Sequence, residues 1–110
     1  MSLATTIDEE LTEEIVQRIC GAARAVRIIL FGSAATGNMN RDSDVDLLVL
    51  EDEPLDIRGE MVRLRAVLRG LGMPFDVLVM STKRFEETKN VIGGIAYPAN
   101  KYGKVIYAAS

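Results

Sequence analysis

The chain has 110 residues, of which 48% are hydrophobic and 26% are charged, and its formal net charge is -3 at pH 7. This composition is typical of a folded globular protein, and the length predicts a single domain over residues 1–110. There is no histidine and one cysteine, which excludes histidine bases, Ser-His-Asp triads and histidine- or cysteine-cluster metal sites. The acidic balance argues against a nucleic-acid partner. Any chemistry must therefore depend on carboxylates, hydroxyls, lysine, arginine and the backbone.

No stretch of the sequence predicts insertion into a membrane. The longest apolar runs fall far short of the roughly 20 residues that a spanning helix needs. The first residues, Met1 to Leu3, lack the basic start and long apolar stretch of a signal peptide. We therefore expect a cytoplasmic protein with no membrane partner.

The elements expected along the chain alternate between helices and strands. A helix from Thr5 to about Gly21 is indicated by an apolar residue every fourth position from Ile7, with a capping box at Thr6 and Glu9. The pattern then predicts strands at 26–31, 44–50, 75–80 and 105–107, helices at 55–71 and 81–89, and a weaker helix at 92–101 interrupted by Pro98. Residues 32–42 read as a turn, a short helical piece and a loop. This order predicts an α/β (α+β) fold with one small mixed sheet and with helices packed mainly on one face of it.

Gly32 and Ser33 directly follow the first predicted strand. A glycine there lets the backbone approach a phosphate closely. A strand-to-helix turn with Ser33 as N-cap is the alternative interpretation, and it is common in α/β proteins. A Walker P-loop is excluded, because Asn38 and Met39 stand where lysine and a hydroxyl residue are required.

Two carboxylates begin the second predicted strand. Alternate residues of a strand share a face, so Asp44 and Asp46 point the same way, roughly 6–7 Å apart along the backbone. Such a pair can bind a divalent cation, and without one the two charges repel each other. The alternative is an exposed acidic start to the strand.

Asp76 is an isolated acid in the otherwise apolar third strand. Either it sits at the edge of the sheet or pairs with an arginine of the 55–71 helix, or, in the functional alternative, it lies beside Asp44 and Asp46 on the neighbouring strand. Three carboxylates beside a Gly-Ser turn would suit two-metal phosphoryl or nucleotidyl transfer. Their hard oxygen ligands select Mg²⁺ or Mn²⁺.

The combined pattern of Leu30-Phe31-Gly32-Ser33, Gly37 and Ser43-Asp44-Val45-Asp46-Leu47 resembles the DNA polymerase β nucleotidyltransferase superfamily, and within it the minimal nucleotidyltransferase (MNT) domains. The resemblance covers most of the chain and continues in Pro74-Phe75-Asp76-Val77. It implies catalytic and metal-binding roles for Asp44, Asp46 and Asp76, and nucleotide binding by Gly32 and Ser33. It further implies transfer of AMP from ATP to a hydroxyl, with a HEPN-domain toxin as the partner that the chain, acting as an antitoxin, modifies.

The chain departs from the family pattern between Gly32 and Gly37, where arginines are common and this sequence has Ser-Ala-Ala-Thr. Arg41, Lys83 and Arg84 are the cations that could compensate. The missing arginines favour the alternative of a protein-binding antitoxin or regulatory module with little catalysis.

A further expectation concerns the face of the sheet that carries the acids. If helices pack mainly on the other face, an apolar patch would be exposed for docking of a partner or a second copy, formed by Leu48, Leu50, Leu78 and Met80. The alternative is that residues 92–107 fold back and cover it.

Overall fold

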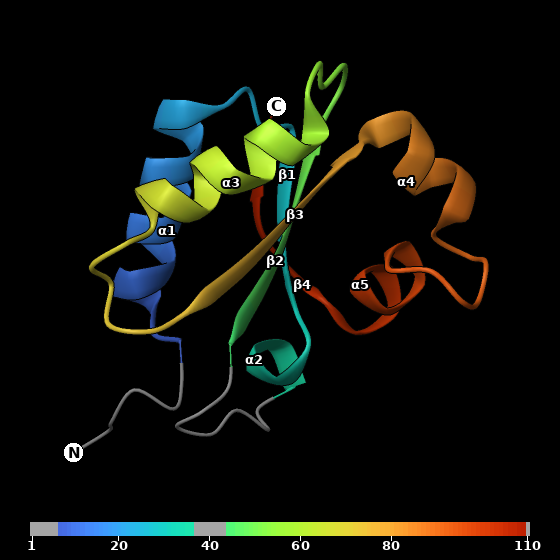
Figure 1. Cartoon of the computed structure of the whole chain (residues 1–110). Helices are drawn as coiled ribbons and strands as arrows, with labels where there is room; N and C mark the ends of the chain where they lie inside the picture. The colour runs from blue at the N-terminus through green and yellow to red at the C-terminus, as the bar shows by residue number, and fades with distance from the viewer. Residues whose placement is uncertain (1–6, 37–43, 110) are drawn as a thin grey trace.

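The computed structural model describes residues 7–36 and 44–109. A four-stranded sheet with the order β3-β2-β1-β4 stands between two layers of helices (Figure 1). The β1 strand is antiparallel to β2 and β4, whereas β2 and β3 are parallel. The mixed sheet confirms the predicted fold class. In chain order the elements are α1 (Glu9–Ala22), β1 (Arg27–Phe31), α2 (Ser33–Thr36), β2 (Val45–Glu51), α3 (Ile57–Val67), β3 (Phe75–Ser81), α4 (Thr82–Thr88), α5 (Ala96–Tyr102) and β4 (Lys104–Ala108).

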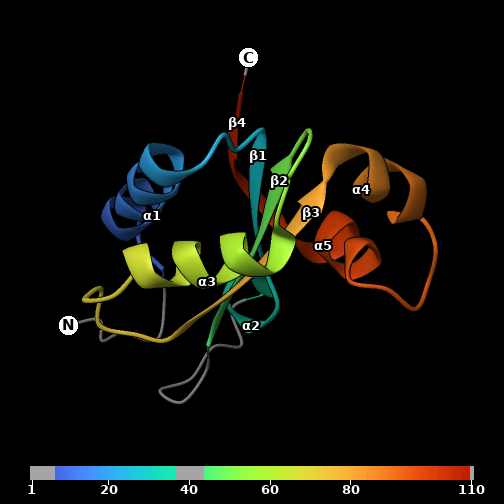
Figure 2. The same ribbon diagram turned by 45° about the horizontal axis from the view of Figure 1, so that its top comes forward.

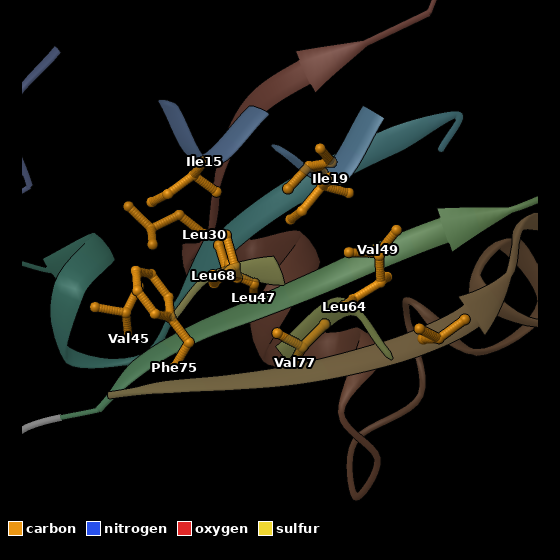
Figure 3. Packing of buried hydrophobic residues seen from close by; sticks show 12 residues of the cluster. Ile15, Ile19, Leu30, Val45, Leu47, Val49, Leu64, Leu68, Phe75 and Val77 are labelled. Carbon is orange, nitrogen blue, oxygen red and sulfur yellow. The ribbon is translucent and has the colours of Figure 1, made fainter. Parts of the chain in front are cut away.

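The larger core lies between one face of the sheet and the two longest helices, α1 and α3 (Figure 3). Strand alternation directs every second residue of β2 and β3 to this face. The helices contribute Ile15 and Ile19 from α1 and Leu64 from α3, with Leu68 at the end of α3. The strand residues packed against them are Ile28, Leu30, Val45, Leu47, Val49, Phe75, Val77 and Val79.

The opposite face of the sheet is covered by α4 and α5 (Figure 2). Phe85 of α4 and Ala96 and Ala99 of α5 pack against Leu48 and Leu50, which are 0% and 1% exposed. Leu78 and Met80 are partly buried in the same cluster. The expectation of helices mainly on one face is therefore wrong, and so is the expected exposed patch on the other face. The C-terminal segment does fold back over this face, and α4, which was not expected to contribute, supplies the largest covering side chain.

Several boundaries differ from the predicted ones for local physical reasons. The α1 helix begins at Glu9, because the Asp8 side chain accepts a hydrogen bond from Leu11 N at 2.8 Å and so acts as the N-cap. The predicted capping box is therefore wrong, and its Thr6 lies outside the described residues. Pro98 does not interrupt α5. It is the third residue of that helix, where the backbone N–H has no intrahelical acceptor. Within the described residues, no helix is long and apolar enough to cross a membrane.

Gly103 joins α5 to β4 at a point with no room for a side chain. Its N–H donates to the Ala99 carbonyl at 3.0 Å, and an added Cβ would collide with that carbonyl oxygen and with Cγ2 of Ile29. Because both groups belong to packed elements, we expect Gly103→Ala to lower the free energy of unfolding by about 1–3 kcal/mol.

Chemical denaturation checks this expectation, with Gly21→Ala as the matched control. Gly21 lies in α1 with open space around its Cα, so its replacement should raise stability by about 0.5–1 kcal/mol. Equal effects of the two substitutions would contradict the packing account of Gly103.

Candidate functional site

The parallel pairing of β2 and β3 sets two of the predicted site residues side by side. Asp46 is the register partner of Asp76 across these strands. On its other side, Asp46 is opposite Phe31, the last residue of β1. Asp44 comes directly before β2 and is exposed. The predicted carboxylates thus gather at one end of the sheet, next to the turn that leads from β1 into α2 (Figure 1).

Gly32 fits closely against Asp46. Its φ of 72° lies in the left-handed region that favours glycine. A Cβ at this position would collide with the Asp46 carboxylate. The turn continues with a hydrogen bond from Ala35 N to the Gly32 carbonyl at 3.1 Å, as Ser33 begins α2. The lack of a side chain therefore lets the carboxylate lie against the backbone of the turn, which places Gly32 and Ser33 beside the acids.

The environment of Asp46 disfavours its charge. Burial raises the pKa of this carboxyl above its ordinary value, and the negative charges of Asp76 and then Asp44 raise it further. Asp76 and Asp44 are therefore each close enough to Asp46 to disfavour its charge. A bound cation would relieve this repulsion, and the oxygen donors are those that Mg²⁺ prefers.

Asp76 also takes part in an ion pair. Its Oδ1 lies 3.1 Å from Nη2 of Arg65 in α3, and both side chains are about half exposed. Two positions that the sequence allowed for Asp76 are therefore both present: it lies opposite Asp46, and it pairs with an arginine of α3. An exposed pair of this kind contributes about 1 kcal/mol or less to stability.

The fit to a metal ion is partial. In the described ranges, no group of three His, Cys, Asp or Glu side chains is arranged to hold a metal ion. Asp44 and Asp46 still offer hard oxygen ligands, and Mg²⁺ usually binds through one or two carboxylates together with substrate phosphates. The donor set fits an ion whose remaining ligands come from a nucleotide.

The cations proposed to compensate for the missing arginines are not gathered at the end of the sheet that carries the aspartates. Lys83 and Arg84 are exposed in the first turn of α4, which follows the opposite end of β3 (Figure 2). Arg41 lies outside the described residues. Arg65 is the cation that the structure brings to Asp76. The arginine-rich sequence of α3 indicated such a partner, but it did not distinguish Arg65 from the other arginines of that helix.

Solved structures show the same fold. A chain of the MntA–HpeT toxin–antitoxin complex matches with a TM-score of 0.68 at 20% identity, covering 89% of this chain and 73% of that one. A chain of a toxin–antitoxin structure with AMP-PNP matches at 0.61 and 22% identity, with coverage of 89% and 73%. A third comes from a tri-AMPylated Shewanella oneidensis HEPN toxin in complex with its MNT antitoxin, at 0.55 and 18% identity, with coverage of 93% and 74%.

A search of the curated proteins finds no significant match to the chain. Comparison with protein-family models, in contrast, identifies the family. The model for the nucleotidyltransferase domain matches residues 11–96, a range that contains the Gly-Ser turn, all three aspartates and Arg65. This confirms the family indicated by the sequence motifs: the chain belongs to the nucleotidyltransferase domain family.

Proposed function

We propose that this chain is a Mg²⁺-dependent nucleotidyltransferase that transfers AMP from ATP to a hydroxyl group of a partner protein. The observation that carries the proposal is the register of Asp46 opposite Asp76, with Gly32 held against Asp46, in a chain of this family. Several of the solved structures with this fold are described as toxin–antitoxin, and one of them contains a tri-AMPylated HEPN toxin with an MNT antitoxin. The presence of a HEPN toxin in one of these structures supports a HEPN-domain protein as the acceptor and an antitoxin role for this chain.

In the proposed reaction, the acceptor hydroxyl attacks the α-phosphorus in line. The new P–O bond forms as the bond to pyrophosphate breaks, and the hydroxyl proton passes to water. Asp44 and Asp46 would hold Mg²⁺, which neutralises charge on the triphosphate and on the leaving pyrophosphate. Gly32 and Ser33 would position the triphosphate through the turn backbone. Asp76 would orient the attacking hydroxyl through its carboxylate, whose Oδ1 is the oxygen that contacts Arg65.

A second candidate is a protein-binding antitoxin with little catalysis. Two observations favour it: residues 33–36 include no arginine, and Asp76 is paired with Arg65. The transferase and the binding module can be distinguished by incubating the chain with Mg²⁺, α-labelled ATP and the candidate partner, the protein encoded by the gene next to its own. Label on the partner supports the transferase, and a stable complex without label supports the binding module. The absence of both label and complex contradicts both.

Removal of the Asp46 charge should separate activity from stability. We expect Asp46→Asn to reduce transfer at least about 100-fold, because a charge that holds the cation is lost. The melting temperature should stay the same or rise, since the substitution relieves repulsion from Asp76 and Asp44. Label transfer and thermal unfolding measure the two effects. Full activity of this variant would contradict the proposed site.

Asp76 and Arg65 form a matched pair of substitutions. Asp76→Asn should slow transfer strongly and leave ATP binding nearly unchanged, because its role lies with the acceptor in the transition state. Arg65→Gln removes the same ion pair but leaves the carboxylate, so transfer should persist. Each variant should lose about 1 kcal/mol of stability or less. If both variants lose activity equally, the ion pair itself is required and the role given to Asp76 is wrong.

Nucleotide binding should depend on the metal. We expect ATP to bind more tightly with Mg²⁺ or Mn²⁺ than in excess chelator, because the triphosphate completes the ligand set begun by Asp44 and Asp46. Calorimetric titration of ATP under the two conditions measures this. Equal affinity in chelator would show that these aspartates do not hold a nucleotide-bound ion.

A further inference from the structure

The solvent side of α3 carries a row of arginines. Positions 58, 62, 65 and 69 follow one another at helical spacing, so their side chains lie in one line along α3 and the turn that ends it. The helical path continues to Arg69, whose N–H donates to the Ala66 carbonyl at 3.3 Å. Arg58, Arg65 and Arg69 are exposed, and Val62 between them is 68% exposed. We call this row the basic face of α3, the helix that lies in front of the sheet in Figure 2.

Two arginines of the basic face have no role in holding the fold together. In the described ranges, the ion pairs of α3 join Arg63 to Glu60 and Arg65 to Asp76, and the guanidinium groups of Arg58 and Arg69 take part in none. Arg58 is also in the first turn of α3, where the helix dipole favours acids over cations. Helix stability therefore does not account for this arginine, and both groups can meet an anion from outside the chain.

A hollow adjoins the basic face, between the second half of α3 and the start of β3. Its volume is about 390 Å³, and its two cations are Arg65 and Arg69. Its apolar lining consists of Val62, Ala66, Leu68, Met73, Pro74 and Phe75. Two guanidinium groups beside an apolar floor fit a peptide segment that carries carboxylates and an apolar side chain.

The hollow lies next to the proposed transfer site. Phe75 lines the hollow and directly precedes Asp76 in β3, an edge strand of the sheet. Arg65 also lines it, and its Nη2 lies 3.1 Å from Oδ1 of Asp76. The chain as a whole has a net charge of -3, so an acidic partner is attracted to this face and repelled by the acidic remainder. The charge pattern thus directs such a partner toward Asp76.

We propose that the basic face of α3 and its hollow dock an acidic segment of the acceptor protein. Carboxylates of the segment pair with Arg58 and Arg69, and an apolar side chain enters the hollow. The identity of this partner as the acceptor rests on the proposed function, whereas the binding of an acidic protein segment does not. A nucleic acid fits less well, because Asp76 borders the hollow and the chain is acidic overall.

Fluorescence anisotropy with labelled probes tests the docking in the absence of ATP and metal. The first probe is a helical peptide of glutamate, leucine and alanine, the second has glutamine in place of glutamate, and the third is oligouridylate. We expect the acidic peptide to bind, with an affinity that falls as salt screens the charges. The glutamine peptide and the oligonucleotide should bind at least about tenfold more weakly. No binding of the acidic peptide, equal binding of the glutamine peptide, or tighter binding of oligouridylate would overturn the proposal.

Arg58→Glu and Arg84→Glu make a matched pair of variants. Each reverses one exposed arginine in the first turn of a helix, but Arg84 is on α4, outside the basic face. We expect Arg58→Glu to weaken binding of the acidic peptide about tenfold, whereas Arg84→Glu should bind like the original chain. Both should unfold at the same or a higher temperature, because an acid suits this end of a helix. Equal weakening in both would show that net charge alone attracts the peptide and would contradict the docking site.

Transfer measurements with the same variants distinguish this proposal from the proposed function. Arg58 is at the start of α3, which follows the end of β2 opposite to Asp46, so Arg58→Glu should bind ATP with Mg²⁺ like the original chain. Label transfer to the candidate partner at low partner concentration should fall about tenfold. Equal transfer by Arg58→Glu and the original chain would overturn the docking and leave the transferase standing. Binding of the acidic peptide without any label transfer would support the docking and contradict the transferase.

Discussion

The parallel pairing of β2 with β3 is the constraint on which the rest of this structure depends. It pairs Val45 with Phe75 and each later residue of β2 with the corresponding residue of β3. Alternate apolar residues of both strands therefore face α1 and α3 together. The same register places Asp46 opposite Asp76 on the other side of the sheet. A slip of one residue would turn the acids toward α1 and α3 and the valines toward the opposite face. Packing of the core and assembly of the acidic cluster are therefore set by the same strand alignment.

The two ends of β2 hold acids in different environments. At the start, Asp44 and Asp46 lie near Asp76, and mutual repulsion is part of the reason that the pKa of Asp46 is raised. At the end, Glu51 is buried beside Glu60, where burial is the first cause of its raised pKa. The first cluster lies beside a backbone turn. The second contains the Arg63 guanidinium, which donates to Glu60, and adjoins an open cavity.

The second face of the sheet is closed by helices from late in the chain. Phe85, Ala96 and Ala99 cover Leu48 and Leu50, so the strands themselves offer little apolar surface on this face. Val91 and Ile92, in the segment between α4 and α5, are strongly exposed.

Local pattern was sufficient for much of the fold. Alternation and periodicity depend on neighbours along the chain, so they predicted all four strands, the long helices and the shared face of Asp44 and Asp46. Three features depended on contacts between distant segments and required the tertiary structure. These are the packing of Phe85 against Leu50, the choice of Arg65 as the partner of Asp76, and the burial of Glu51 against Glu60. The alternation that predicted a core side for Val45, Leu47 and Val49 extends to Glu51, but only the position of α3 decided that a second acid and an arginine would meet it there.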